Sequence, residues 1–418
     1  MSLEVIPDTR LRTSIVGRDT TKGSDREPRL HVLYVTNQLP FPAHSGGQVR
    51  EAQLLARLGK NCHIHLAVIT ESFSRDRRNL VIALEHCVSV AIFEASESSE
   101  TDQPRRITRY TNPSFDRYLS DVAETFDLIH VEGYFLLHHL PAASATPIFL
   151  SEENVEFDLV RQMQNRGSGD DVGWRRVLEL ERAAWRRAAV VSVVTEPDRA
   201  TMSELAPDCI FVHIPSGMDH IGRIGRRHHG VGDIVTFVGN YEWSPTRQGA
   251  DRLLLTIWPR LTQMNENWRL RLVGAGIDPA LRSLADQTER VDLIGRVPSI
   301  SSYLAATDVF VCPIEIGSGA MIKMAEALRA GCAIVANSHS MRGLPAEAKD
   351  AVVMAESNDD FVDQIGRLLA DPARRTLLAA RAQESIGEMA TWDDSADAMM
   401  RQWESTARIA SPIARQPH

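Results

Sequence analysis

Residues 313–336 read PIEIGSGAMIKMAEALRAGCAIVA and decide the fold. A short apolar run ends in a glycine-rich turn here, and a helical pattern follows the turn. Glycine lets the backbone approach an anion closely, and the free N–H groups of a helix start favour negative charge. The segment therefore predicts a phosphate-binding turn between a strand and a helix. The residues expected at this turn are Gly317, Ser318, Gly319, Ala320 and Met321.

The expected helix after this turn carries two polar residues on one face. Lys323 and Glu326 are three positions apart and are therefore neighbours on a helix. A lysine supplies positive charge to a phosphate, and a carboxylate can accept two hydrogen bonds from the hydroxyls of a ribose. The alternative is an ordinary surface ion pair, which is the commoner arrangement for such a pair considered alone.

Short apolar runs alternate with longer helical patterns in two separate parts of the chain. This alternation is typical of βα units around a parallel sheet, so we expect an α/β fold with two doubly wound, Rossmann-like domains. The expected strands of the first series are 31–36, 63–69, 89–93, 128–131, 148–150, 190–194 and 210–214. Those of the second series are 234–238, 270–273, 291–294, 309–312, 333–335 and 351–354.

One helix of the first series has a clear apolar stripe. In residues 172–189, the side chains of Val177, Leu180, Ala184 and Ala188 share one side of the expected helix. The charged residues that lie largely outside that stripe are Arg175, Arg176, Glu179, Arg186 and Arg187. The stripe is therefore expected to pack on the first sheet.

The remaining segments complete the expected domain organisation. Residues 1–29 mix arginines with acids, lack the apolar core of a signal peptide and are expected to be a disordered leader. Residues 30–214 form the first domain and 234–390 the second. The linker between them, 215–233, holds five glycines and no apolar periodicity. Residues 391–418 are expected to form a helix that crosses back to the first domain, followed by a tail.

Composition argues against several classes of protein. The 418 residues carry a formal net charge of −9, so no nucleic-acid partner is expected. The five cysteines are scattered singly, which argues against a disulfide framework. No apolar run reaches the roughly 18 residues that a membrane helix requires. We expect a cytoplasmic protein and leave peripheral contact with the inner face of the cell membrane open.

The basic and aromatic segment 105–118 could touch an anionic acceptor or a membrane surface, but a solvated loop is the expected interpretation.

Each domain has a polar loop after its first strand. Gly46 and Gly47 precede a helix expected at 48–58, and Gly239 and Asn240 occupy the equivalent loop of the second domain. Ligands of open α/β sheets bind at the carboxyl ends of strands, so both loops are candidate binding loops. Tight βα turns that bind nothing are the alternative.

Other motifs of the second domain restrict the ligands that it is expected to bind. Arg247 follows the first loop of this domain. It is either a phosphate ligand or one more solvated arginine. Residues 274–279 begin like a dinucleotide fingerprint but lack its third glycine, which disfavours a nicotinamide cofactor. The sequence has no metal-binding motif, so no bound metal is expected.

Several segments together resemble the GT-B glycosyltransferases, specifically the bacterial retaining enzymes of the family-4 type. The resemblance runs from about residue 31 to the C-terminus. It implies a GT-B fold whose two domains face a cleft, with a nucleotide-sugar donor on the second domain and an acceptor on the first. The matching segments are Gly46-Gly47, EENVE at 152–156 (similar to a family HNVE stretch), 189–198, FVGN at 237–240, LVGAG at 272–276, LIGRV at 293–297 and GSGAMIKMAEALRAG at 317–331.

The chain departs from this family at a pair of glutamates that lie eight positions apart. Here these positions are Ser318 and Glu326, so one carboxylate is retained. In the family the retained residue binds the nucleotide ribose and the missing one contacts the donor sugar. Lys323 or Glu315 is expected to compensate.

A second departure lies in the first domain. The family often has a histidine after the fourth strand, where this chain has Glu132 and Tyr134. Either side chain could face the acceptor, because a carboxylate at the carboxyl end of a strand is well placed for this. The alternative is that Glu132 only caps a loop.

The function expected from the resemblance is retaining transfer of a sugar from a nucleotide diphosphate sugar to a hydroxyl of a saccharide, lipid-linked or small-metabolite acceptor, as in polysaccharide biosynthesis. Lys323, Arg247 and Glu132 are the catalytic candidates, and the loop glycines with Glu326 are the binding candidates. The donor is a substrate, so no separate cofactor is expected. The alternatives are a nucleotide-sugar epimerase of the same fold and a non-catalytic nucleotide-sugar-binding partner of another transferase. The oligomeric state is not predicted.

Overall fold

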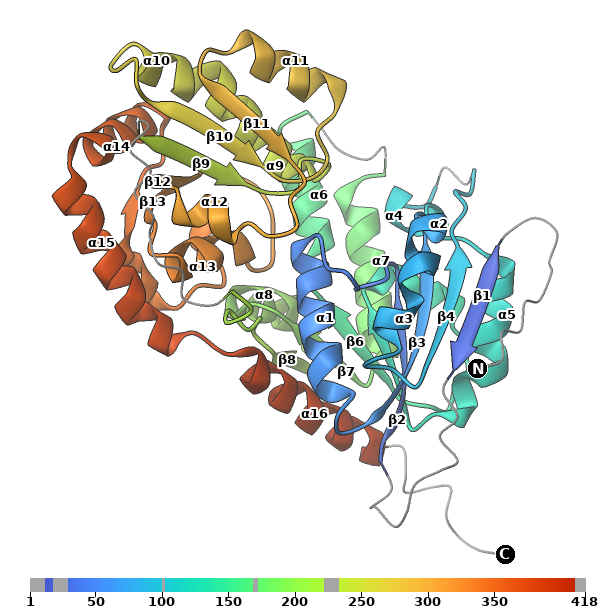
Figure 1. The fold of residues 1–418 in the computed structure, drawn as a ribbon. Coiled ribbons are helices and arrows are strands. Elements are labelled where there is room, and N and C mark those ends of the chain that lie inside the picture. Colours follow the sequence, from blue (N-terminus) through green and yellow to red (C-terminus); the bar gives the residue numbers. More distant parts are fainter. Residues whose placement is uncertain (1–11, 18–28, 100–101, 168–171, 222–232, 410–418) are drawn as a thin grey trace, which may run out of the picture. The chain divides into compact units, whose positions relative to one another are not determined.

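Figure 1 shows the computed structural model, which describes residues 12–17, 29–99, 102–167, 172–221 and 233–409. The chain divides into two compact units. Unit 1 comprises Met1–Pro215 and Trp392–His418, and unit 2 comprises Ser216–Thr391. Each unit has a sheet of its own, flanked by helices, so both are α/β as the sequence pattern predicts. Most of the expected linker, residues 222–232, lies outside the described part of the chain.

Unit 1 is built on an eight-stranded sheet in the order β1-β4-β3-β2-β5-β6-β7-β8. Strand β1 runs antiparallel to β4, and the other neighbouring pairs are parallel. Because β2 lies between β3 and β5, the carboxyl ends of β2 and β5 flank a topological switch point. All strands of the expected first series are present. The strand bounds are β1 Thr13–Gly17, β2 His31–Thr36, β3 His63–Thr70, β4 Ser89–Glu94, β5 Leu128–Glu132, β6 Ile148–Glu152, β7 Val190–Val193 and β8 Phe211–His213.

Strand β1 falls inside the leader that the sequence indicates to be disordered. For residues 13–17 that expectation is wrong, since they pair with β4 from Thr13 opposite Phe93 to Gly17 opposite Ser89. Ser14 and Val16 are buried, and alternate residues of this short strand therefore face the protein. Five residues of period two are too few to stand out among the charged residues around them.

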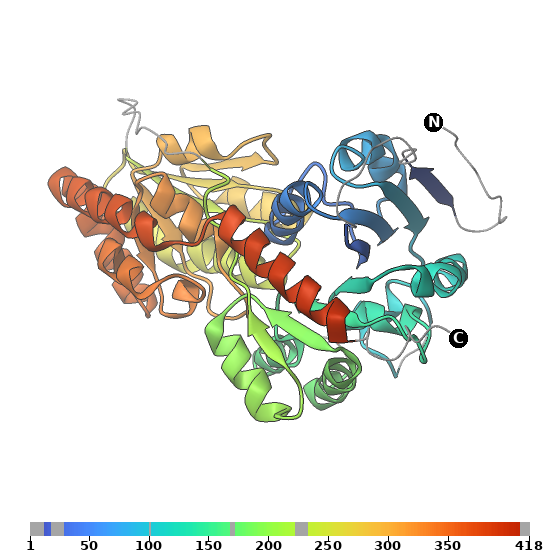
Figure 2. The same cartoon turned by 90° about the horizontal axis from the view of Figure 1, so that it is seen from below.

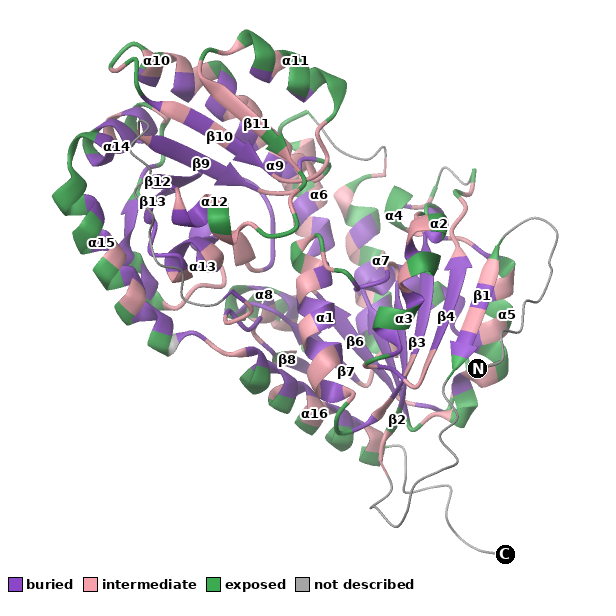
Figure 3. Cartoon of the chain, in the orientation of Figure 1, coloured by how far each residue is buried: buried purple, intermediate pink, exposed green. Residues whose placement is uncertain are grey.

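The sheet of unit 1 is covered on both faces, as expected for a mainly parallel sheet. Consecutive residues of β2 belong to different hydrophobic clusters, because side chains alternate along a strand. Leu33 and Val35 join one cluster, and Val32 and Tyr34 join the other. Figure 3 shows these strands as largely buried.

The helices of unit 1 supply those two faces. Helix α1 starts at Gly46, with Ser45 as its N-cap, so the glycine pair forms its first turn and does not precede it as expected. Gly46 and Gly47 therefore place backbone N–H groups at a helix start. The helix bounds are α1 Gly46–Leu58, α2 Phe73–Asp76, α3 Leu80–Ala83, α4 Arg105–Thr108, α5 Pro113–Val122, α6 Glu156–Gln164, α7 Trp174–Arg187, α8 Glu196–Leu205 and α16 Trp392–Ile409.

The apolar stripe expected for α7 packs in the core of unit 1, since Leu180 and Ala188 lie against the same hydrophobic cluster as Val177 and Ala184. Val177 and Ala184 are buried, but the other buried residues of this helix are Glu181 and Trp185. Glu181 is fully buried because its carboxylate accepts hydrogen bonds from the backbone N–H groups of Glu156 and Phe157, both at 2.9 Å. The Glu181 carboxylate thus accepts hydrogen bonds from backbone N–H groups in the first turn of α6 that have no partner within the helix. An apolar pattern in the sequence cannot reveal this role.

Helix α16, the long red helix of Figure 2, belongs to unit 1 although it follows unit 2 in sequence. It packs against α1 and also contacts β5 and β6. Its buried residues include Trp392, Met399 and Trp403. Near its start, Asp393 pairs with Arg57 at the end of α1.

Unit 2 has a six-stranded sheet in the order β11-β10-β9-β12-β13-β14, and its neighbouring strands are parallel. Its first strand, β9, lies between β10 and β12, so the carboxyl ends of β9 and β12 flank the switch point of this sheet. All strands of the expected second series are present. The bounds are β9 Ile234–Val238, β10 Arg269–Val273, β11 Val291–Gly295, β12 Val309–Cys312, β13 Ala333–Ala336, β14 Val352–Met354, α9 Ser244–Arg252, α10 Trp258–Thr262, α11 Pro279–Gln287, α12 Ser301–Ala305, α13 Ile322–Arg329, α14 Asn358–Ala370 and α15 Pro372–Ser385.

Candidate functional site

Three loops meet at the carboxyl edge of the sheet in unit 2. The backbone N–H of Gly239 donates to the carbonyl of Val273 at 3.0 Å, and that of Tyr241 donates to Ala275 at 2.9 Å. The N–H of Gly274 donates to the carbonyl of Gly295 at 2.9 Å. The loops after β9, β10 and β11 therefore support one another, and the FVGN, LVGAG and LIGRV motifs lie together.

Gly274 is required by this arrangement. Its φ is +144°, and a Cβ at this position would lie 1.7 Å from the carbonyl oxygen of Gly239. No side chain can occupy that space, and L residues rarely adopt this φ. The glycine lets the loops after β9 and β10 come into direct contact.

The glycine-rich turn between β12 and α13 approaches the first of these loops. Gly317 and Gly319 have φ values of +139° and +75°, and Met321 is the N-cap of α13. A Cβ on Gly317 would lie 3.3 Å from the ring of Trp243. The predicted order of strand, glycine turn and helix is thus present, beside the loop after β9. Ser318 and Met321 are buried and Ala320 is half-buried, so the turn is packed against the unit.

Lys323 extends from the first turn of α13 to the loop after β9. Its Nζ donates to Oγ1 of Thr246 at 3.0 Å and lies 5.3 Å from the centre of the Phe237 ring. A Cβ on Gly239 would be 2.8 Å from this Nζ. Burial lowers the pKa of Lys323, while Cys312 and Glu326 oppose this shift. The ammonium therefore lies where the two switch-point strands end, as a phosphate-binding lysine requires.

Glu326 has a different partner, so the alternative of a surface pair between Lys323 and Glu326 does not describe the site. Its Oε1 accepts a hydrogen bond from Nε2 of His220 at 2.9 Å. The two side chains are 13% and 9% exposed. His220 lies in the segment assigned to the linker, and no sequence signal marked it as a site residue.

Arg247 is engaged by two carboxylates. Its Nε bonds to Oδ1 of Asp251 at 3.0 Å, and its NH1 bonds to Oδ2 of Asp278 at 2.6 Å. Asp278 also caps α11, where it accepts from the N–H of Leu281 at 2.7 Å. A phosphate would have to compete with these partners, and the phosphate-binding role of Arg247 stays a prediction.

Glu315 and Asn240 flank the same edge. Glu315, a candidate to compensate for the missing glutamate, pairs with Arg252 at 2.9 Å. Asn240 accepts through Oδ1 from the N–H of Glu242 at 3.2 Å, which closes a local turn. A Cβ on Gly276 would lie 2.6 Å from this Oδ1, so Asn240 also packs on the loop after β10.

In unit 1, Glu132 ends β5 beside the switch point and is held in a buried network. Its Oε1 accepts from the hydroxyl of Tyr34 and from Nε2 of His130, the latter at 2.9 Å. Nδ1 of His130 accepts from the indole N–H of Trp403 on α16 at 3.1 Å, which leaves Nε2 to carry the proton. Burial alone would raise the pKa of Glu132, but His130, Tyr34 and Arg50 lower it overall. Tyr134, the other acceptor-side candidate, is buried.

Two more acids that the sequence did not single out lie near Glu132. Glu51, on α1, is buried and accepts from Nε2 of Gln38 at 2.6 Å. Glu153, just after β6, is half-buried, and a Cβ on Gly47 would lie 2.6 Å from its Oε2. Burial and the charge of Glu132 raise the pKa of Glu153 to about 7. Three carboxylates therefore gather beside the first turn of α1.

Comparison with known proteins adds to this geometry. Residues 232–371, which include every candidate residue of unit 2 except His220, match the family model described as Glycosyl transferases group 1. This part of the chain therefore resembles the group 1 glycosyltransferases. No curated protein matches the sequence.

Solved structures of low sequence identity share the fold of this chain. Sucrose-phosphate synthase from Thermosynechococcus elongatus is 16% identical with a TM-score of 0.68, over 91% of this chain and all of that chain. HepE of Anabaena, in complex with UDP and glucose, is 13% identical with a TM-score of 0.64, over 90% and 100%. WaaG, involved in lipopolysaccharide biosynthesis, is 16% identical with a TM-score of 0.61, over 91% and 100%. These likenesses establish the GT-B fold.

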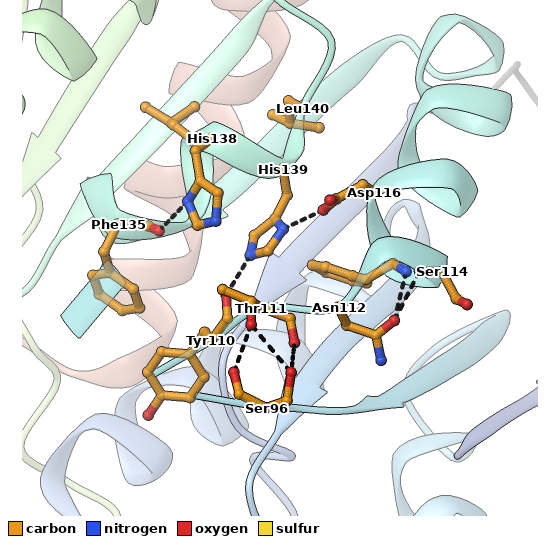
Figure 4. A network of polar contacts seen from close by, with 12 residues as sticks. Ser96, Tyr110, Thr111, Asn112, Ser114, Asp116, Phe135, His138, His139 and Leu140 are labelled. Atoms are coloured by element: carbon orange, nitrogen blue, oxygen red, sulfur yellow. Dashed lines mark hydrogen bonds and ion pairs between the residues drawn. The ribbon is translucent and has the colours of Figure 1, made fainter. Parts of the chain in front are cut away.

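The segment 105–118 is not the solvated loop that was expected. It forms α4 and α5, and the Asn112 side chain caps α5 by accepting from the N–H groups of Ser114 and Phe115 at 2.8 and 3.2 Å. Figure 4 shows the ring of His139 between the carbonyl of Tyr110, at 2.9 Å, and the carboxylate of Asp116. Both partners of the His139 ring are hydrogen-bond acceptors. The sequence pattern missed the contacts of His139 because they join residues 23 and 29 positions apart in the chain.

Two kinds of feature are absent from the described ranges of the chain. No helix there is long and apolar enough to cross a membrane. No group of three or more histidine, cysteine or acidic residues in those ranges is arranged to hold a metal ion. Contact with a membrane face stays a prediction.

Proposed function

We propose that this glycosyltransferase moves a sugar from a nucleotide diphosphate sugar, bound by unit 2, to a hydroxyl of a saccharide or glycoconjugate acceptor bound by unit 1, with retention of the anomeric configuration. The observation that carries the donor assignment is the position of Lys323. Its Nζ lies beside Gly239 and Thr246, next to the glycine turn that starts α13. HepE, which shares the fold, is described as a complex with UDP and glucose.

The costly event in this reaction is departure of the nucleotide diphosphate. As the bond from the anomeric carbon to the diphosphate oxygen breaks, negative charge grows on the phosphate and the sugar becomes oxocarbenium-like. Lys323 and the N–H groups at the start of α13 would stabilise that charge, without a bound metal. Glu326 would accept hydrogen bonds from the ribose hydroxyls.

On the acceptor side, the new bond forms between the acceptor oxygen and the anomeric carbon. The acceptor proton passes to an oxygen of the leaving phosphate, so a protein base is not required. Glu132, held by Tyr34 and His130, would supply fixed negative charge near the acceptor. Glu153 faces the start of α1 and would contact the acceptor hydroxyls.

Transfer itself tests the proposal. The protein is mixed with UDP-, GDP-, ADP- or TDP-glucose and a panel of methyl glycosides, and the released nucleotide and the anomeric proton coupling of the product are measured. We expect one donor to react and to give an α-linked product from an α-linked donor. A β-linked product would contradict retention. Nucleotide binding without any transfer would favour the non-catalytic partner, for which Ser318 in place of an acid is the supporting observation, and conversion of the donor sugar without an acceptor would favour an epimerase.

A further inference from the structure

The segment before the undescribed part of the linker is built into unit 2. The N–H of Met218 donates to the carbonyl of Ala390 at 2.9 Å, and Nε of Arg329 donates to the carbonyl of Ile221 at 2.9 Å. Met218 and Ile221 are 4% and 7% exposed and belong to the hydrophobic core of this unit. Residues 218–221 are therefore fixed to unit 2 at both ends, and His220 lies between the two bonded positions.

This placement directs His220 at one oxygen of Glu326. The distance from Nε2 to Oε1 is 2.9 Å, and both side chains are largely buried. A glutamate has three rotatable side-chain bonds, and holding it in one orientation costs conformational entropy. A hydrogen bond from a fixed donor meets this cost before any ligand arrives, which improves binding through preorganisation.

We propose that His220 is a positioning residue, which holds the carboxylate of Glu326 in the orientation that receives the ribose hydroxyls of the donor nucleotide. The inference rests on the proposed function, since it requires a ribonucleotide in unit 2. The imidazole bonds to Oε1, and Oε2 with the remaining lone pairs of the carboxylate stays available to two hydroxyls. His220 itself does not contact the reacting atoms.

The test compares ribonucleotides with their 2′-deoxy analogues. Dissociation constants of UDP, GDP and ADP, and of dUDP, dGDP and dADP, are measured by calorimetry for the wild type and for H220A, H220Q and E326A. We expect the wild type to bind one ribonucleotide about tenfold more tightly than its deoxy analogue, because a buried acceptor is left unpaired in the deoxy complex. In H220A the ribonucleotide affinity should fall about tenfold while the deoxynucleotide affinity changes less than twofold.

Two further variants separate positioning from stability. H220Q keeps an N–H donor at a similar reach and should restore at least half of the discrimination between the two sugars. R329A removes the other side-chain bond that fastens this segment to α13 but leaves Glu326 untouched. This variant should lower the melting temperature without changing the ratio of the two affinities.

The outcomes distinguish failure of the positioning role of His220 from failure of the proposed donor site. If H220A weakens ribonucleotide and deoxynucleotide equally, or if H220Q behaves as H220A does, His220 is structural and the inference fails while the donor site stands. If E326A loses the preference for the ribonucleotide but H220A keeps it, Glu326 binds the ribose without help from His220, and the inference also fails. If no nucleotide binds the wild type, the proposed function fails with it.

Discussion

Nζ of Lys323 lies 3.0 Å from Oγ1 of Thr246, although the two residues are 77 positions apart. Lys323 belongs to the glycine turn and helix after β12, and Thr246 to the helix that follows the loop after β9. The hydrogen bond therefore joins the two strand ends that flank the switch point of unit 2. It holds the ammonium at the place where the phosphate site is proposed.

Removing the hydroxyl of Thr246 should destabilise unit 2. The variant T246V keeps the shape of the side chain but leaves a partly buried ammonium without this acceptor, which costs about 1–3 kcal/mol because the donor is charged. Urea unfolding of the purified protein measures the change. Added nucleotide diphosphate should recover part of the loss by neutralising the ammonium.

Thr236 offers a matched control in the same unit. It is also fully buried, and its hydroxyl bonds to that of Thr307 at 2.8 Å, a pair of neutral groups. The variant T236V should cost less, about 1 kcal/mol, and nucleotide should not repair it selectively. Equal losses in T236V and T246V would show that Lys323 does not depend on Thr246.

Gly274 should tolerate no side chain. The variant G274A places a Cβ 1.7 Å from the carbonyl oxygen of Gly239 at a φ of +144°, so the loops after β9 and β10 must separate. We expect a loss of about 3 kcal/mol or more, measured as a lower melting temperature. G387A is the control, since a Cβ there meets nothing within 4 Å, and it should change stability by less than about 0.5 kcal/mol. A stable G274A would refute the proposed contact.

The bond from Trp403 to His130 should contribute to unit 1 beyond the packing of the indole ring. W403F removes the N–H donor and leaves Nδ1 of His130 without it, whereas W185F alters a ring that is equally buried but whose N–H has no hydrogen-bond partner among the described residues. W403F should therefore lose about 1 kcal/mol more than W185F in chemical unfolding. If W185F loses as much, the bond contributes nothing to stability.

Glu153 should reduce the stability of the protein at alkaline pH. Its pKa is raised to about 7 from an ordinary value of 4.5, so the folded state binds the proton more tightly than the unfolded chain does. Unfolding free energy is therefore lost as the pH rises from 4.5 through about 7. E153Q should be about 1–3 kcal/mol more stable than the wild type at pH 8 and similar to it at pH 4.5, as urea unfolding at both pH values would measure.

The exposed Glu404 on α16 serves as the control for this pH dependence. E404Q should follow the wild type at both pH values, because an exposed carboxylate is solvated in the folded and unfolded states alike. If E153Q also follows the wild type, the acids beside α1 do not interact as the structure indicates.

The sequence predicted the parallel strands well because most contain an apolar run, and the central ones, such as Ile234–Val238, are buried on both faces of a sheet. It missed Thr13–Gly17, whose five residues alternate between the two faces and lie at an antiparallel edge. It also misjudged residues 105–118, because polar and charged residues indicate a loop when their partners are unknown. Glu97, Glu156 and Glu71 pair there with Arg105, Arg106 and Arg109.

The candidate site was predictable where the backbone dictates the residue type. Gly317 and Gly319 mark the turn because their φ values are positive, and that requirement is local. His220 and Thr246 could not be predicted, since each acts through a contact with α13 that depends on the folded chain. Glu153 was visible in the sequence, but its raised pKa follows from burial beside Glu132.

A calorimetric titration can show whether Lys323 binds the diphosphate of a nucleotide. The wild type and K323M, which keeps most of the aliphatic stem, are titrated with UDP, GDP, ADP and TDP. The corresponding nucleosides are titrated in parallel for comparison. We expect one diphosphate to bind the wild type at least about tenfold more tightly than it binds K323M, while its nucleoside binds both proteins about equally. Equal affinity of the diphosphate for both proteins, or no binding of any of the four diphosphates, would contradict this role of Lys323.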